Sequence, residues 1–211
     1  MKKVLVINDG ADLGSSYGRP FADFGKITGD MSLIEKDPES ILCAVFTGGS
    51  DINPSLYGHK NLNSWINESR DIFEKKCFDK LSALKIPLFG ICRGSQFLCA
   101  MAGGKIVQHL DNHGGYHEVR VLKNDRRVKV NSTHHQMQVP PVDAEVIAVC
   151  DPRRSERYVF DEPDFTPEYE YEIVYYPNIK ALSAQYHPES MPKDSEGWKY
   201  YQELIEEYIS R

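Results

Sequence analysis

One cysteine flanked by glycines constrains this chain more than any other feature. The segment Gly90–Gln96 (GICRGSQ) follows the apolar run 86–91 and precedes a stretch of helical pattern. A nucleophile between a buried strand and a helix, with glycine two residues to each side, is a nucleophile elbow, here with Cys92 in place of serine. The turn is so tight that a Cβ at either glycine would crowd neighbouring strands. At a helix N-terminus the unpaired N–H groups and the helix dipole favour a thiolate.

The rest of the chain alternates short apolar runs with amphipathic segments. This alternation predicts an α/β domain with a mostly parallel central sheet. A length of 211 residues suits a single domain, residues 1–211. Acids, aromatics and two prolines set 151–176 apart, and we expect an insertion or flap with a strand at its end. The expected strands are 4–7, 44–46, 86–91, 146–150 and 181–184, the expected helices are 71–84, 95–102 and 195–209, and 119–122 with 128–130 should form a hairpin.

Charge and cysteine usage exclude several classes of protein. Lys plus Arg is 25 and Asp plus Glu is 31, a net charge of −6, so the chain lacks the basic surface of a nucleic-acid binder or of a protein held on anionic membranes. No apolar run approaches the roughly 20 residues of a membrane span, and the N-terminal run is too short for a signal peptide. Five cysteines without a CxxC pair are typical of a reducing compartment, so we expect a cytoplasmic protein.

Two further segments could complete a catalytic site. In Gln185–Glu189 (QYHPE), His187 can take and return a proton while Glu189 fixes its tautomer, as the third member of a triad does. Gly48-Gly49 follows an apolar run, where it is either a plain β-turn or a loop whose backbone N–H donates to an oxyanion. The backbone N–H of Arg93 could be the other donor.

Together these segments resemble the class I glutamine amidotransferase-like superfamily. The similarity is greatest to its γ-glutamyl hydrolase branch, which includes γ-glutamyl-γ-aminobutyrate hydrolase. It implies a flavodoxin-like three-layer fold. The matching segments are Gly48–Tyr57, Arg70–Glu74, Gly90–Gln96, Gly103–Leu110, Asn131–Gln136 and Gln185–Glu189.

The resemblance implies a role for each matching residue. Cys92 would be the nucleophile, His187 the general base and acid, and Glu189 the orienting carboxylate. The N–H groups of Gly49 and Arg93 would form the oxyanion hole.

Two more residues receive roles from the same resemblance. Gln96 would hold the α-amino and carboxylate end of a glutamyl group. One histidine of the pair His134-His135 would line the substrate pocket, and we favour His135.

The histidines do not predict a metal site. His134 and His135 are adjacent, so on a strand their side chains point to opposite faces, and no cysteine or carboxylate stands at ligand spacing. His109, His113 and His117 recur every four residues, but an asparagine and a glycine pair between them break a helix, which predicts ordinary loop histidines. We expect neither a metal nor a cofactor.

The function expected from the resemblance is hydrolysis of a γ-glutamyl amide in a small metabolite. It would proceed through a glutamyl thioester and release glutamate and an amine. The alternative is a glutaminase subunit that supplies ammonia to a separate synthetase partner, since the chain shows no ATP-binding segment of its own. An intact cysteine, histidine and glutamate count against a third class, a non-enzymatic glutamyl-binding protein. Two stretches depart from the family pattern, residues 9–29 and residues 151–176. We expect a mobile loop at Gly14–Gly18, and loops in both stretches would select the amine.

Overall fold

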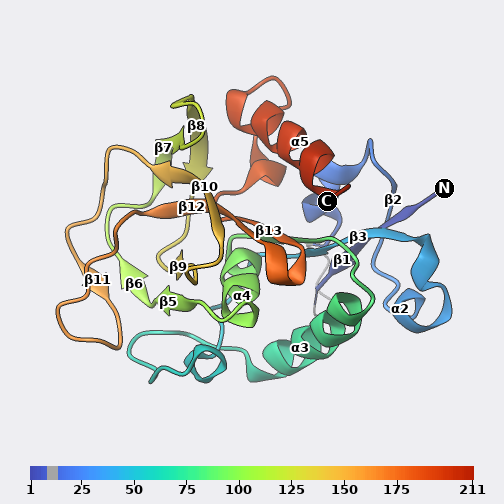
Figure 1. Ribbon diagram of the computed structural model, residues 1–211, viewed down its shortest axis with the longest axis horizontal. Helices are drawn as coiled ribbons and strands as arrows, with labels where there is room; N and C mark the ends of the chain where they lie inside the picture. The colour runs from blue at the N-terminus through green and yellow to red at the C-terminus, as the bar shows by residue number, and fades with distance from the viewer. Residues whose placement is uncertain (9–13) are drawn as a thin grey trace.

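A nine-stranded sheet runs through the centre of the computed structural model, which describes residues 1–8 and 14–211 (Figure 1). Its strands are β1 (Lys3–Ile7), β2 (Lys26–Thr28), β3 (Ile41–Phe46), β4 (Leu88–Ile91), β7 (Gly115–Val121), β8 (Arg127–Ser132), β10 (Glu145–Cys150), β12 (Tyr171–Tyr176) and β13 (Ala181–Ala184). Their order in the sheet is β2-β1-β3-β4-β13-β12-β10-β7-β8. The first five strands of this order pair in parallel, and the remaining pairings are antiparallel. Only β12 and β7 therefore run against the other strands of this sheet, and the predicted hairpin is β7–β8.

Helices cover both faces of the sheet, as Figure 1 shows. On one face α2 (Leu33–Lys36), α3 (Glu68–Ala83) and α4 (Arg93–Met101) pack into one apolar core with β1 and β3. On the opposite face α5 (Glu196–Tyr208) and the 3-10 turn η1 (Arg19–Phe21) form a second core. The remaining helical segments are α1 (Gly14–Tyr17), η2 (Pro38–Ser40), η3 (Pro54–Tyr57), η4 (Pro177–Ile179) and η5 (Pro188–Ser190). The predicted α/β fold, with helices on both sides of its sheet, is confirmed.

Two small ribbons lie outside the main sheet. β5 (Lys105–Val107) pairs with β9 (Met137–Val139), and β6 (His109–Leu110) pairs with β11 (Tyr158–Val159). The segment expected to be an insertion thus divides into two parts. Residues 151–170 contain β11, which pairs with β6 outside the main sheet. Residues 171–176 form β12, a strand of the main sheet whose residues are all buried. An exposed insertion is therefore confined to 151–170, because β12 is needed to bridge β13 and β10.

The long helices begin where their sequences provide caps. The Asn67 side chain accepts a hydrogen bond from the Arg70 N–H at the start of α3, and Ser195 accepts from Trp198 at the start of α5. Helix α4 begins at Cys92 without a side-chain cap. Among the described residues, no helix combines the length and apolar character that crossing a membrane requires.

Three neighbouring parallel strands end at one edge of the sheet. The carboxyl ends of β3, β4 and β13 lead into Thr47-Gly48-Gly49, Cys92 and Gln185-Tyr186-His187. Ligands bind at such an edge in open α/β sheets. The order of the strands therefore brings together three segments that lie far apart in the sequence.

The close approach of α4 to β3 gives the first prediction. A Cβ on Gly94 would overlap the backbone carbonyl of Phe46, and neither backbone can rotate away. Gly94→Ala should destabilise the fold by several kcal/mol, lowering the melting temperature by about 5 °C or more. Gly29→Ala is the matched control, because a Cβ there meets nothing within 4 Å. Equal melting temperatures for the two variants would contradict this packing constraint.

Candidate active site

Cys92 occupies the strained turn between β4 and α4. Its backbone lies at φ 54° and ψ −110°, a conformation that non-glycine residues rarely adopt. The Cys92 N–H donates to the Ala184 carbonyl at 2.8 Å, and its own carbonyl accepts from Ser95 N–H at 3.0 Å. A Cβ on Gly90 would overlap the Gly94 backbone, so the two glycines permit each other's approach. The strain is held by these contacts, and it presents the sulfur at the sheet edge.

His187 and Glu189 lie next to this turn and are held as a pair. The His187 Nδ1 lies 2.6 Å from Glu189 Oε1, and the Glu189 side chain is almost wholly buried. Asn131 on β8 fixes the histidine backbone from both sides, accepting from His187 N–H and donating to its carbonyl, each at 3.0 Å. Since Nδ1 is taken by Glu189, Nε2 is the nitrogen available to Cys92.

The surroundings of His187 stabilise its charged form. Burial works against the charge, but the neighbouring Cys92 sulfur and the Glu189 carboxylate outweigh it and raise the pKa of His187 to about 10. An imidazolium is the form that can return a proton to a leaving amine.

The loop after β3 lies against this pair, with glycines where side chains would collide. A Cβ on Gly48 would meet the Tyr17 hydroxyl and His187 Cε1. Gly49 adopts φ +145°, and a Cβ there would overlap the Arg70 guanidinium. Arg93 is the first residue of α4, a position whose N–H has no acceptor within the helix. The geometry is compatible with the oxyanion donors predicted at Gly49 and Arg93.

A buried ionic cluster connects the loop after β3 to the start of α4, the two segments that carry the predicted oxyanion donors. Arg70 donates to the Thr47 carbonyl at 3.0 Å and to Glu74 at 2.8 Å. Glu74 also pairs with Arg93, which bonds Asp71 at 2.5 Å. All four charged side chains are buried, and burial raises the pKa of Asp71 even though Arg93 opposes that shift. The cluster joins the β3 loop, α3 and the start of α4 through charges that must all be paired.

The two predicted substrate-binding residues lie in different environments. Gln96 is buried on α4, and its side-chain amide donates to the Gln136 carbonyl at 3.2 Å. His135 is half exposed, with Nε2 3.1 Å from Asp51, and that carboxylate raises its pKa. His134 faces the interior, so the neighbouring side chains do point in opposite directions.

Tyr17 is a residue of this site that sequence reasoning missed. It ends the short helix α1, where a mobile loop was expected, and residues 9–13 of that N-terminal stretch lie outside the described residues. Its ring centroid is 6.3 Å from that of His187, and burial together with Glu189 and Cys92 raises the pKa of the phenol. No pattern in the sequence Gly14–Gly18 indicates a contact with His187, which lies more than 150 residues further along the chain.

These observations define the class. A cysteine elbow, a histidine–glutamate pair and a glycine loop at the edge of a three-layer α/β fold are those of a class I glutamine amidotransferase-like protein. Residues 26–152, more than half of the chain, match the model of the Peptidase C26 family. The chain belongs to this family.

Individual relatives are similar over parts of their length. The carbamoyl phosphate synthase small chain of Helicobacter pylori is 33% identical over 58% of this chain and 29% of its own. The γ-glutamyl-CDP-amidate hydrolase of Campylobacter jejuni is 28% identical over 52% of this chain and 50% of its own. The chain thus spans half or less of these two curated relatives. A glutamine amidotransferase of Thermotoga maritima shares the fold, with a TM-score of 0.58, 18% identity and coverage of 98% of this chain and 84% of its own.

The shared carboxylate in the buried ionic cluster gives the second prediction. Glu74→Gln keeps the shape but leaves Arg70 and Arg93 without their common anion, so stability should fall by about 3 kcal/mol. Asp79→Asn on the same helix is the control, because its pair with Lys75 is exposed and should contribute less than about 1 kcal/mol. Urea unfolding of both variants measures the difference. A Glu74→Gln protein as stable as the control would contradict this role.

The His187–Glu189 pair gives the third prediction. The raised pKa means that the imidazolium persists above its ordinary titration near pH 6.5 and is lost as the pH rises through about 10. The stability that the charged His187 contributes is therefore complete below about pH 6.5, and it is lost as the pH rises from there through about 10. Glu189→Gln removes one of the causes, so the alkaline limb of kcat/KM should move to lower pH while part of the activity remains. The pH profile of glutamate release checks this, and an unmoved limb would contradict it.

Proposed function

We propose that this protein hydrolyses a γ-glutamyl amide bond in a small metabolite, releasing glutamate and an amine. The observation that carries the proposal is the site itself: Cys92 on the elbow, next to a histidine already oriented by Glu189 at 2.6 Å in the single chain. The similarity to a γ-glutamyl-CDP-amidate hydrolase supports the substrate class. All five cysteines are free in the structure, which supports a reducing, cytoplasmic setting.

The proposed reaction has two steps. The Cys92 sulfur attacks the γ-carbonyl carbon, and the oxyanion is held by the N–H groups of Gly49 and Arg93. The carbon–nitrogen bond breaks as the imidazolium of His187 gives its proton to the departing amine, leaving a glutamyl thioester. His187 then takes a proton from water, the hydroxide adds to the thioester, and the Cys92 thiolate leaves as glutamate is released. Gln96 and His135 are proposed to hold the glutamyl end and line the pocket.

A second candidate function shares every one of these residues. The similarity to carbamoyl phosphate synthase small chains favours a glutaminase subunit, which would pass ammonia to a separate synthetase. In that case glutamine is the substrate and a partner protein the activator. The half-exposed His135 and the 83% exposed Trp65 are both held by Asp51, and this exposed pair is proposed to meet either the amine of a metabolite or a partner.

The fourth prediction separates these functions. The purified protein alone is assayed for glutamate release from glutamine and from a panel of γ-glutamyl amines. Rapid turnover of one γ-glutamyl amine, with glutamine poor, is the expected result. Slow release from glutamine alone would favour the glutaminase subunit instead.

Variants tie the activity to the site. Cys92→Ala should abolish turnover without changing the melting temperature, and His187→Ala should do nearly the same. Cys99→Ala is the control, because Cys99 is a buried thiol on the same helix that takes no part in the proposed reaction. Glutamate release that survives Cys92→Ala would overturn the mechanism.

A further inference from the structure

A second cluster of ionisable side chains is buried between β7, β8 and β12, and the reaction described above does not use it. Three histidines and two glutamates meet there, contributed by three separate stretches of the chain. Each of the five side chains is at most 3% exposed. The residues are His113, His117, His134, Glu170 and Glu172.

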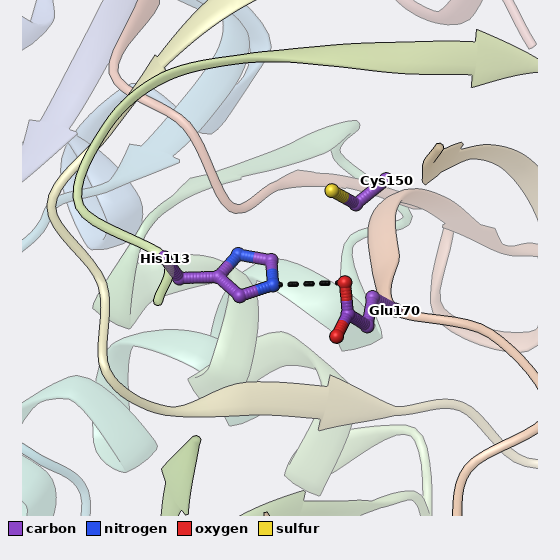
Figure 2. A group of neighbouring side chains, drawn as sticks. All are labelled: His113, Cys150 and Glu170. Carbon is purple, nitrogen blue, oxygen red and sulfur yellow. Dashed lines mark ion pairs between the residues drawn. The ribbon is translucent and has the colours of Figure 1, made fainter. Parts of the chain in front are cut away.

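Glu170 is fully occupied by hydrogen-bond donors. Its Oε1 accepts from the Ser155 N–H at 2.7 Å and the Tyr158 hydroxyl at 2.8 Å, and its Oε2 accepts from the Arg154 N–H at 2.9 Å. The Nε2 of His113 lies 3.0 Å from the same Oε2, as Figure 2 shows. These contacts lower the pKa of Glu170 to about 2, although burial opposes the shift. Three hydrogen bonds therefore already hold Glu170, and His113 Nε2 approaches the same carboxylate.

Cys150 also lies beside His113 and Glu170 in Figure 2. Its thiol donates to the Pro152 carbonyl at 3.5 Å, which is the behaviour of a protonated sulfur. Glu170 accepts several hydrogen bonds and Cys150 donates one, so these two residues hold the His113 ring in place and are not the metal ligands proposed below. We call them the hydrogen-bonded support of His113.

Glu172 is in the opposite situation, because imidazole nitrogens converge on one of its oxygens. Its Oε1 lies 3.0 Å from His117 Nε2, 3.4 Å from His134 Nε2 and 3.7 Å from His113 Nδ1. Its Oε2 is buried and meets no hydrogen-bond partner in the described part of the chain. The ligand atoms of His113, His117 and Glu172 all lie within 4.8 Å of one another.

Several nitrogen and oxygen atoms of this cluster are buried without a hydrogen-bond partner. His134 Nδ1 lies 2.9 Å from the Gln136 carbonyl, which only accepts, so Nδ1 carries the hydrogen. His113 Nε2 lies 3.0 Å from Glu170 Oε2 without hydrogen-bond geometry. Among the described residues no hydrogen-bond partner meets either His113 nitrogen, His134 Nε2 or Glu172 Oε2. Buried polar atoms without partners, gathered around a carboxylate, favour a cation among them.

We propose that His113, His117 and Glu172 hold a divalent transition metal, with Zn²⁺ the best match. The ligand atoms of these three residues all lie within 4.8 Å of one another, and two imidazoles and a carboxylate are donors that Zn²⁺ accepts at about 2.0–2.2 Å. His134 is not part of this group, and its Nε2 lies beside the carboxylate, 3.4 Å from Glu172 Oε1. The contact of His113 Nε2 with the Glu170 carboxylate is of the kind that orients metal-binding histidines.

The place of this cluster in the fold indicates a structural role. The Glu172 carbonyl accepts from the Gln185 N–H at 2.8 Å, two residues before the catalytic histidine. His134 follows β8, whose Asn131 holds the His187 backbone. A metal on His113, His117 and Glu172 would join β7 to β12, the strand bonded to the segment that carries His187, and would stabilise that segment without contacting substrate.

The fifth prediction measures the metal itself. The purified full-length protein should contain about one equivalent of Zn²⁺ by elemental analysis. After removal of the metal with a chelator, added Co²⁺ should give the intense visible absorption of a tetrahedral complex. Removal should also lower the melting temperature, and Zn²⁺ should restore it.

Variants locate the metal. Glu172→Gln and His117→Ala should each lose most of the bound metal, whereas Cys150→Ser should keep it because Cys150 belongs to the hydrogen-bonded support. Cys92→Ala should also keep it, which makes the result independent of the proposed activity.

Two outcomes would overturn the proposal. The first is a wild-type protein that contains no metal and takes up neither Zn²⁺ nor Co²⁺, which would make the cluster a protonated acid–imidazole network. The second is metal that survives Glu172→Gln but is lost in Cys150→Ser, which would place it on the other side of the His113 ring. The wild-type measurement decides the first case even if a variant fails to fold.

Discussion

The carboxylate of Glu74, buried between two arginines, is the interaction on which the rest of the active site depends. Arg70 reaches from this carboxylate to the loop after β3, and Arg93 extends it to the first turn of α4. These two segments carry the proposed oxyanion donors. A buried charge cannot be left unpaired without a large penalty, so the cluster is either complete or broken. That all-or-none property is suited to holding backbone N–H groups in fixed positions.

The strained turn at Cys92 and the raised pKa of His187 are consequences of the same packing. The turn is possible because glycines let α4 approach β3 and β4 closely, and it places Cys92 next to a histidine whose other nitrogen is held by Glu189. Backbone contacts therefore position Cys92, the proposed nucleophile, and side-chain charges stabilise the imidazolium of His187, the proposed acid.

How much the sequence predicted depended on whether the signal was local. The elbow, the hairpin β7–β8 and the capped helices are encoded within a few residues, and their predictions are confirmed. The strand expected at the end of 151–176 is β12, but the sequence did not show where the insertion stops, because acidic and aromatic residues continue into this strand, which is buried on both faces. The contact of Tyr17 with His187 and the meeting of His113, His134 and Glu172 join distant segments, and only the order of strands brings them together.

The central claim is that Cys92 forms a covalent glutamyl thioester. Rapid acid quenching of the protein during turnover of a γ-glutamyl amide, followed by peptide mass spectrometry, tests it directly. The account predicts one glutamyl group on the peptide that contains Cys92, absent when His187→Ala prevents formation of the thioester. Continued turnover with no acylated cysteine, or acylation at another residue, would contradict it.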